Sequence, residues 1–340
     1  MKSIFLTIPR TILLLAVSAL VMVSCDKDAE SDAHANPKAD KLDPGIGSGG
    51  TVLTLTGSDL AQMRSIIFDK GNIPAPFNPT FNTASAIIFR VPDTASGGDQ
   101  NIILTNVDGK RLSVPINVVA VPIASSVFPV DFSEGSTITL TGRNFETTAK
   151  VVLSGTTTEA TIVSKSLKQL VITMPATTLP TTKLDITNVS GTMTTTQVLT
   201  NIDQAYAVFK DALHADWEDW SWSLTNSPYT SDKISGTASL QAAYGGAWGG
   251  MQLHAKVKAA LAPYKYVTFW IKGADVEKKM KFNFNWTNDQ TLTIPPNVWT
   301  YYKIDLGIFK NAGVAELETF VMQIHDDPKT LYFDNILLVK

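Results

Sequence analysis

Apolar and polar residues alternate in short runs from residue 51 onward, and this period of two is typical of half-buried β-strands. The run Leu-Thr-Leu-Thr-Gly at 53–57 returns as Ile-Thr-Leu-Thr-Gly at 138–142. Two further features follow both copies in the same order, namely a strand that ends in proline (87–92 and 170–175) and a Thr-Asn-Val-x-Gly turn (105–109 and 187–191). The spacing of about 80 residues predicts two copies of one antiparallel β-sandwich.

A third region, over 204–340, predicts a larger β-sandwich. Its strand-like runs are rich in aromatic residues, and all seven tryptophans of the chain lie between Trp217 and Trp299. The runs cover 266–273, 280–286, 299–306, 319–325 and 331–338. One short helical piece is expected among them, near 307–311. The fold class is therefore all-β, with two small sandwiches before a larger one.

The recurring runs resemble the TIG/IPT immunoglobulin-like domain, whose signatures are a Leu-Thr-Leu-Thr-Gly run and a strand that ends in proline. The resemblance covers 46–120 and 121–203. It implies two immunoglobulin-like sandwiches that act as spacers.

The N-terminus has the pattern of a targeting segment. An apolar run over 12–23 follows two basic residues and is too short to span a bilayer as a stable anchor, so we predict a signal peptide over 1–24. The run ends beside Cys25, the only cysteine of the chain. This resembles the lipobox of bacterial lipoproteins, although Met22 stands where that family usually carries leucine. The resemblance implies an acylated Cys25, and the alternative is a secreted protein with a spare thiol.

An acidic stretch lies directly behind the cysteine, over 26–32. It resembles the signal that exports Bacteroidetes lipoproteins to the outer face of the outer membrane, and the alternative is a solvated tether. Residues 33–45 show no apolar period, so we expect a flexible tether over 25–45.

Composition excludes several classes of function. Lys and Arg number 28 against 31 Asp and Glu, so the chain lacks the basic excess that binding to a nucleic-acid backbone requires. One cysteine excludes an internal disulfide, and four scattered histidines do not predict a His-rich metal site. Most conventional catalytic machinery is therefore missing from the sequence.

Four motifs of the third region resemble a jelly-roll carbohydrate-binding module. They are Asp-Trp-Ser-Trp at 219–222, Ala-Trp-Gly-Gly-Met-Gln-Leu at 247–253, Phe-Trp-Ile-Lys-Gly at 269–273 and Tyr-Phe-Asp-Asn-Ile at 332–336. With the lipobox and the tandem TIG/IPT repeats, they make the chain similar to surface glycan-binding proteins of Bacteroidetes polysaccharide-utilisation systems. The resemblance implies non-catalytic capture of a polysaccharide at the outer membrane, with xyloglucan or mixed-linkage β-glucan favoured. It also implies a glycan importer complex and a surface glycosidase as partners.

Sugar chemistry identifies candidate aromatic residues. A pyranose ring offers an apolar C–H face to a flat aromatic ring and a rim of hydroxyls to amides. Trp220, Trp222 and Trp248 lie in segments rich in Ser, Gly and Asp, where an indole is hard to bury, so we expect them to bind sugar. Trp286 is a fourth candidate, and core packing is its equal alternative. The remaining tryptophans and two tyrosines are expected in the core (Trp270, Trp299) or are weaker candidates (Trp217, Tyr229, Tyr244).

Strand alternation identifies candidate polar residues. Asn283 and Asn285 share one side of their strand, opposite Phe282, Phe284 and Trp286. In another strand Gln323 and His325 share one side in the same way. We expect these four side chains to hydrogen-bond sugar hydroxyls, and the alternative is an ordinary solvated sheet face.

Two other classes of function stay open. A glycoside hydrolase needs two carboxylates about 5–9.5 Å apart, and the Glu-x-Asp-x-x-Glu strand motif of β-sandwich glucanases is absent. The nearest pairs are Glu316 with Glu318, expected on a solvated face, and Asp216 with Glu218. The third class is a structural or adhesive surface protein.

The jelly-roll resemblance also implies one structural Ca²⁺, held by Asp211 and Asp334, and no cofactor that binding would require. Carboxylate oxygens suit this ion. The alternative for each aspartate is a hydrogen bond to the amide of a neighbouring loop.

Overall fold

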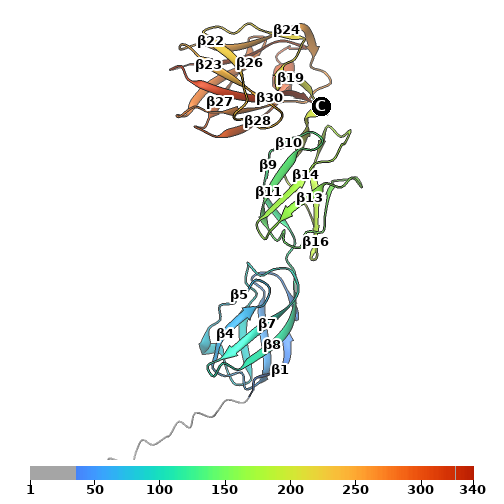
Figure 1. Ribbon diagram of the computed structural model, residues 1–340, viewed down its shortest axis with the longest axis vertical. Coiled ribbons are helices and arrows are strands. Elements are labelled where there is room, and N and C mark those ends of the chain that lie inside the picture. The colour runs from blue at the N-terminus through green and yellow to red at the C-terminus, as the bar shows by residue number, and fades with distance from the viewer. Residues whose placement is uncertain (1–35, 326) are drawn as a thin grey trace, which may run out of the picture. The chain divides into compact units, whose positions relative to one another are not determined.

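The computed structural model describes residues 36–325 and 327–340, and nearly all of its regular structure is β-strand (Figure 1). The expected signal peptide, Cys25 and the acidic stretch lie outside the described residues. In the described part of the chain, no helix is long and apolar enough to cross a membrane. The chain forms two compact units, and the second comprises Val119–Lys340 together with residues 96–98.

The first unit is a β-sandwich. Its strands are β1 (Lys38–Asp43), β2 (Ile46–Gly47), β3 (Val52–Ser58), β4 (Met63–Phe68), β5 (Ile73–Pro74), β6 (Ala86–Arg90), β7 (Gly98–Asn106) and β8 (Arg111–Val118), with a 3-10 turn at Pro79–Phe81. They pair in two sheets, in the orders β1-β3-β6 and β2-β8-β7-β4-β5. Alternation buries Leu53 and Leu55 of β3 completely and leaves the threonines between and beside them partly or fully exposed.

Strand β1 shows that part of the expected flexible tether is ordered. Residues 38–43 lie within the segment 25–45, yet they pair antiparallel with β3. The strand lies at the edge of its sheet, and none of its six residues is fully buried. An edge strand with no buried face needs no apolar alternation, and the sequence pattern therefore missed it.

The second unit begins with another small sandwich. Its strands are β9 (Ile123–Phe128), β10 (Asp131–Phe132), β11 (Thr137–Arg143), β12 (Lys150–Leu153), β13 (Thr161–Lys165), β14 (Gln169–Thr173), β15 (Thr181–Thr182), β16 (Leu184–Asn188), β17 (Gly191–Thr194) and β18 (Leu199–Asn201), followed by a 3-10 turn at Ile202–Gln204. The sheets have the orders β13-β14-β11-β9, β12-β16-β17 and β10-β18-β15. Phe132, Ile138, Leu140 and Phe145 lie in a core of their own.

The C-terminal sandwich completes the second unit. Its strands are β19 (Tyr206–Lys210), β20 (Ala212–Leu213), β21 (Trp217–Asp219), β22 (Leu224–Tyr229), β23 (Ser239–Tyr244), β24 (Gly250–Ala260), β25 (Tyr266–Lys272), β26 (Lys278–Phe284), β27 (Thr287–Ile294), β28 (Trp299–Asp305), β29 (Glu316–Ile324) and β30 (Thr330–Val339). The expected helical piece is α2 (Gly307–Lys310). One sheet has five strands in the order β21-β24-β29-β26-β27, and a seven-stranded sheet is built around β30. The expected all-β fold with three sandwiches is confirmed.

Aromatic rings fill the space between these two sheets. Phe282 and Phe284 from β26 pack with Phe269, Phe309 and Phe320, and all five side chains are completely buried. Ring centroids lie 5.3 Å apart for Phe269 and Phe282, and 4.7 Å apart for Phe284 and Phe309. This core fixes the two sheets against each other and leaves the outer side of each to other contacts.

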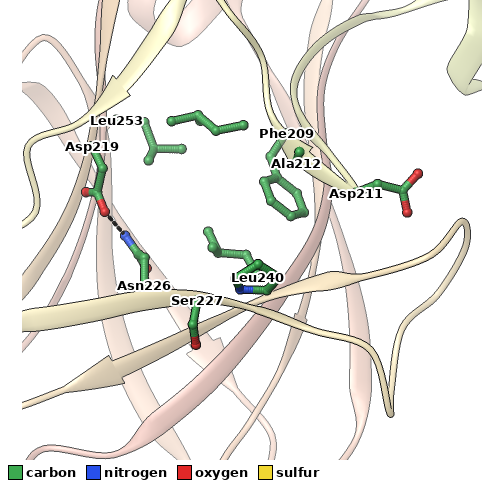
Figure 2. A pocket seen from close by; sticks show the side chains of 10 residues that line it. Phe209, Asp211, Ala212, Asp219, Asn226, Ser227, Leu240 and Leu253 are labelled. Carbon is green, nitrogen blue, oxygen red and sulfur yellow. Dashed lines mark hydrogen bonds between the residues drawn. The ribbon is translucent and has the colours of Figure 1, made fainter.

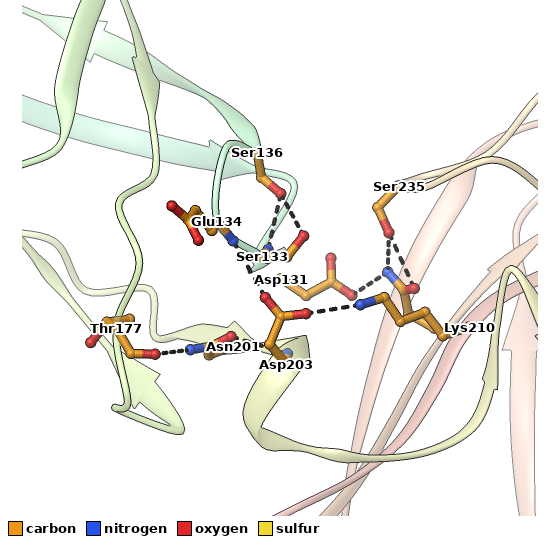
Figure 3. Close-up of polar contacts among 10 residues, drawn as sticks. Asp131, Ser133, Glu134, Ser136, Thr177, Asn201, Asp203, Lys210 and Ser235 are labelled. Atoms are coloured by element: carbon orange, nitrogen blue, oxygen red, sulfur yellow. Dashed lines mark hydrogen bonds and ion pairs between the residues drawn. The ribbon is translucent and has the colours of Figure 1, made fainter. Parts of the chain in front are cut away.

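A buried carboxylate joins the small sandwich of the second unit to the C-terminal sandwich (Figure 3). One oxygen of Asp131 accepts hydrogen bonds from Nε1 of Trp270 and Nδ2 of Asn335, both at 2.9 Å. Phe128 packs edge-on against Trp270, with ring centroids 5.5 Å apart. Trp270 is therefore buried as expected, but on the outer side of its sheet and against the preceding sandwich.

Candidate functional site

The outer side of the five-stranded sheet collects the polar positions of its strands. In β24, Met251 and Leu253 enter the core, so Gln252 and His254 point outward. The register places Gln252 beside Val321 and Val321 beside Asn283. We call this side the aromatic face, and its members are Glu218, Trp220, Trp222, Trp248, Gly250, Gln252, His254, Lys281, Asn283, Trp286, Asp289, Gln323 and His325.

Three tryptophans on the aromatic face are about half exposed. The exposed fractions are 51% for Trp220, 54% for Trp248 and 56% for Trp286. Large apolar side chains with this much exposure, gathered on one sheet face, mark a surface built for contact. The fourth candidate, Trp222, is partly covered and lies 5.5 Å from the ring of Trp286 at an interplanar angle of 34°.

Trp222 lies directly on the backbone of the sheet. Its amide and carbonyl pair with Gly250, and a Cβ atom at that glycine would fall 2.1 Å from the indole ring. Only glycine therefore lets the ring approach the sheet this closely. Nε1 of Trp222 donates to the Trp248 carbonyl at 2.8 Å, which links the two tryptophan segments.

Trp220 and Trp248 each lie against the imidazole ring of a histidine. Trp220 stacks on His254 with ring centroids 3.6 Å apart and an interplanar angle of 5°. Nε1 of Trp220 donates to Glu218 at 3.0 Å, so the indole is held from two sides. Trp248 lies 4.8 Å from His325, and Nε2 of Gln323 donates to the Trp248 carbonyl at 3.0 Å.

A charged pair borders the face on β27. Asp289 lies 3.0 Å from the ammonium of Lys281 and accepts a hydrogen bond from Nδ2 of Asn283 at 2.7 Å. The hydrogen bond from Lys281 holds the pKa of Asp289 below its usual value. Since the two charges cancel, this edge offers hydrogen-bonding groups without a surplus of positive charge.

The two predicted asparagines hold the backbone. Asn283 is nearly buried, and its oxygen accepts from the amide of Trp286 at 3.1 Å. Asn285 accepts from the amides of Glu318 and Thr319 and donates to the Glu316 carbonyl. Both amides therefore position the turn that carries Trp286. Gln323 and His325 stay partly exposed on the face.

The predicted strand parity for Trp286 is wrong. Strand β26 ends at Phe284, and Asn285 and Trp286 both have positive φ, at 51° and 59°. Two left-handed residues reverse the alternation, so the ring leaves the side of Phe282 and Phe284 and joins the aromatic face. The weaker candidates Trp217 and Tyr244 are buried, with Nε1 of Trp217 bonded to Tyr206 and the Tyr244 hydroxyl bonded to the Met322 carbonyl.

Several members of the face were not among the sequence candidates, namely Gln252, His254, Lys281 and Asp289. Gln252 and His254 alternate with Met251 and Leu253, a signal that the sequence does contain. Glu218 and Asp289 join the face only through the order of the strands in the sheet, which no local pattern encodes.

The two aspartates assigned to calcium lie at one loop of the C-terminal sandwich. Asp211 accepts from the amides of Thr237 and Ala238 and from the Thr237 hydroxyl. Asp334 accepts from the amides of Ile234 and Ser235, and burial raises its pKa to about 6. These donors occupy Oδ1 of Asp211 and Oδ2 of Asp334. The described residues hold no group of three or more His, Cys, Asp or Glu side chains suited to a metal. In this arrangement each aspartate makes the loop-amide hydrogen bonds that are the expected alternative to calcium.

Two segments of the chain, residues 37–117 and 122–201, match the IPT/TIG domain. The chain carries two IPT/TIG domains. The tandem repeat expected from the recurring motifs is thereby confirmed, and the matched segments cover the two small sandwiches.

Comparison with solved structures finds several that are similar to the described chain. A surface glycan-binding protein from Prevotella bryantii is 13% identical over 90% of this chain and 99% of its own, with a TM-score of 0.52. A protein from a complex xyloglucan utilization locus in Bacteroides uniformis is 16% identical over 90% of this chain and 100% of its own, with a TM-score of 0.45. A family 29 carbohydrate-binding module is 14% identical over 40% of this chain and 87% of its own, with a TM-score of 0.30. The first likeness shows a shared fold, and no curated protein matches the sequence.

Proposed function

We propose that the chain binds a polysaccharide without cleaving it, through the aromatic face of its C-terminal sandwich. One observation carries the proposal: Trp220, Trp248 and Trp286, each about half exposed, lie on one sheet face with amides and imidazoles beside them. Flat apolar rings with polar neighbours match a sugar, which has C–H faces and a rim of hydroxyls. The fold shared with a surface glycan-binding protein is consistent with this function.

The number of exposed tryptophans on the aromatic face is enough for a useful affinity for glycan. An indole that loses about 100 Å² to a sugar contributes about 2–3 kcal/mol at about 25 cal/mol/Å². Association costs at least about 4 kcal/mol, so one tryptophan cannot hold a glycan. Two or three platforms with hydrogen bonds from side chains such as Gln323 and His325 reach millimolar to micromolar binding, which suffices where many tethered copies meet one polymer.

The layout favours an extended, uncharged chain, with a plant β-glucan such as xyloglucan or mixed-linkage glucan as our candidate. Trp222 lies over Gly250 and Trp220 over His254, four residues further along β24. At about 3.3 Å per residue these two points are about 13 Å apart, which exceeds the length of one pyranose ring. The ion pair of Lys281 with Asp289 leaves no cationic surplus for a polyanionic glycan.

The positions of the carboxylates argue against hydrolysis. Glu218 and Asp289 belong to the first and last strands of a five-stranded sheet, so about 19 Å separates them at about 4.8 Å per strand. Glycoside hydrolysis needs two carboxylates no more than about 9.5 Å apart. Glu318 is paired with Lys258 at 2.7 Å, as expected for a solvated face.

Incubation of the purified protein with insoluble or gel-embedded β-glucans separates the three function classes. We expect retention with no new reducing ends. New reducing ends would mean a hydrolase, and neither retention nor cleavage on a panel of polysaccharides would leave a structural or adhesive role.

We also propose that Cys25 is lipid-attached and that the protein faces outward on the outer membrane. Capture there would concentrate glycan for an importer complex and a surface glycosidase. Protease added to intact cells should remove the protein, whereas full protection would place it in the periplasm. A Cys25→Ala variant should leave the membrane fraction, because a lipid chain contributes about 0.8 kcal/mol per buried methylene.

A further inference from the structure

A cavity of about 210 Å³ opens at the edge of the C-terminal sandwich (Figure 2). It lies between the two sheets, beside β20, β21 and β22. Its floor is apolar, and Phe209 and Leu240 reach it from the seven-stranded sheet while Leu253 reaches it from the five-stranded one. Ala212 and Pro228 lie exposed at its border.

Four polar side chains line the same cavity (Asp211, Asp219, Asn226 and Ser227), and the donors of Asn226 and Ser227 are already used. Nδ2 of Asn226 donates to Asp219 at 2.8 Å (Figure 2). It also donates to the Ser221 hydroxyl at 3.1 Å. The hydroxyl of Ser227 donates to Gln241 at 3.2 Å. The side-chain oxygen Oδ1 of Asn226 is closed to solvent, so a ligand in the cavity cannot reach it, whereas the carboxylate of Asp219 is exposed at the rim. A ligand therefore meets acceptors here, and it must supply the hydrogen-bond donor itself.

Size and lining define the rest of the ligand. Ligand pockets are mostly apolar with a few polar groups that fix orientation. An apolar cavity of about 150 Å³ already admits benzene, so this one has room for a substituted ring. The negative charge of Asp219 at the rim opposes an anionic ligand.

We infer that this cavity is a second ligand site, which takes an aromatic ring bearing a hydroxyl group, that is, a phenol. The ring would pack on Phe209, Leu240 and Leu253, and its hydroxyl would donate to the carboxylate of Asp219. The segment from Asp219 to Asn226 also carries Trp220 and Trp222 of the aromatic face. The phenolic group can therefore come from a free phenol or from a substituent on a glycan that lies over Trp220. The second source rests on the proposed function, whereas the first does not.

Titration of the full chain with phenol, followed by ligand-observed NMR, tests the site without any glycan. We expect saturable binding with a dissociation constant on the order of 1 mM, and binding of benzoate at least about tenfold weaker. Ala212→Trp fills the border of the cavity and should weaken phenol binding at least about tenfold. Ala262→Trp, at an exposed alanine between β24 and β25, is the matched control and should bind phenol as the wild type does.

Unaltered phenol binding by a folded Ala212→Trp variant would overturn the inference, and so would equal binding of benzoate by the wild type. The benzoate comparison needs no variant, so it decides even if Ala212→Trp does not fold. Retention of a glycan esterified with a hydroxybenzoic acid, before and after alkaline de-esterification, then separates the two sources. If de-esterification weakens retention of the wild type but not of Ala212→Trp, the site binds a glycan substituent. If de-esterification does not change retention of the wild type, the site binds a free phenol. Because the titration contains no glycan, its failure would leave the proposed polysaccharide binding intact.

Discussion

Asp131 should make the C-terminal sandwich less stable as the pH rises. It is almost completely buried where the second IPT/TIG domain meets that sandwich, and one of its oxygens has no hydrogen-bond partner among the described residues. Burial raises the pKa of Asp131 from 3.8 to about 6. A carboxyl group whose pKa is raised by folding stabilises the protein fully below its unfolded value, and this contribution is lost as the pH rises through its folded value. Replacement by asparagine removes this titration and keeps an oxygen for Trp270 and Asn335.

The magnitude follows from the two pKa values. The interval between 3.8 and about 6 corresponds to about 3 kcal/mol of unfolding free energy. About 2 kcal/mol of this is lost between pH 4 and pH 8, because the titration is already under way at pH 4. Asp334 lies nearby, and its own pKa is raised to about 6 by burial and, in a smaller part, by the charge of Asp131. Asp131→Asn should therefore reduce the loss of unfolding free energy between pH 4 and pH 8 by at least about 2 kcal/mol.

Urea unfolding followed by tryptophan fluorescence is the assay, since all seven tryptophans lie in the C-terminal sandwich. We expect the difference in unfolding free energy between wild type and Asp131→Asn to shift in favour of the variant from pH 4 to pH 8. The matched control is Asp203→Asn, which breaks the half-exposed ion pair with Lys210 at the same junction (Figure 3). Asp203→Asn should lower the unfolding free energy by no more than about 1 kcal/mol. Its unfolding free energy should still fall from pH 4 to pH 8 as in the wild type, because Asp131 remains. Parallel pH profiles for wild type and Asp131→Asn would refute the reasoning.

Three further changes have defined outcomes. Gly250→Ala should push the Trp222 ring off the sheet and weaken retention in a β-glucan gel at least about tenfold, and unchanged mobility would contradict that placement. Asn285→Ala should lower the unfolding free energy in urea by about 2–3 kcal/mol, because three backbone groups lose their partner; a loss below about 0.5 kcal/mol would contradict it. Melting temperatures in EDTA and in excess Ca²⁺ should agree, because loop amides already donate to Oδ1 of Asp211 and Oδ2 of Asp334, whereas a rise with calcium would support the metal site.

Strand positions in the sandwiches follow from the sequence because one side of each strand must be buried. The alternation of Phe282 and Phe284 with polar residues predicts which side chains enter the core, and both are completely buried. The same argument fails for β1, whose exposed edge position imposes no pattern. It fails again at Trp286, where two residues of positive φ break the alternation.

The members of the aromatic face could be predicted only in part. Trp220 and Trp248 were expected to be exposed because their segments are rich in small and polar residues, and each is about half exposed. Trp270 is buried as expected, but the side of the sheet on which it lies could not be predicted, because its indole hydrogen-bonds Asp131, 139 residues away. Asn285 shows another limit, because an amide that binds backbone and one that binds a ligand look alike in a sequence.

Affinity electrophoresis of the Trp220→Ala/Trp248→Ala variant in a β-glucan gel tests the central claim most directly. Phe81→Ala is the matched control, since it removes another exposed aromatic ring from the first IPT/TIG domain. Loss of two platforms should remove about 4–6 kcal/mol of binding free energy, so the double variant should run as it does in a gel without glycan. The wild type and Phe81→Ala should be retarded. A folded double variant that is retarded as strongly as the wild type would contradict the assignment of binding to this face.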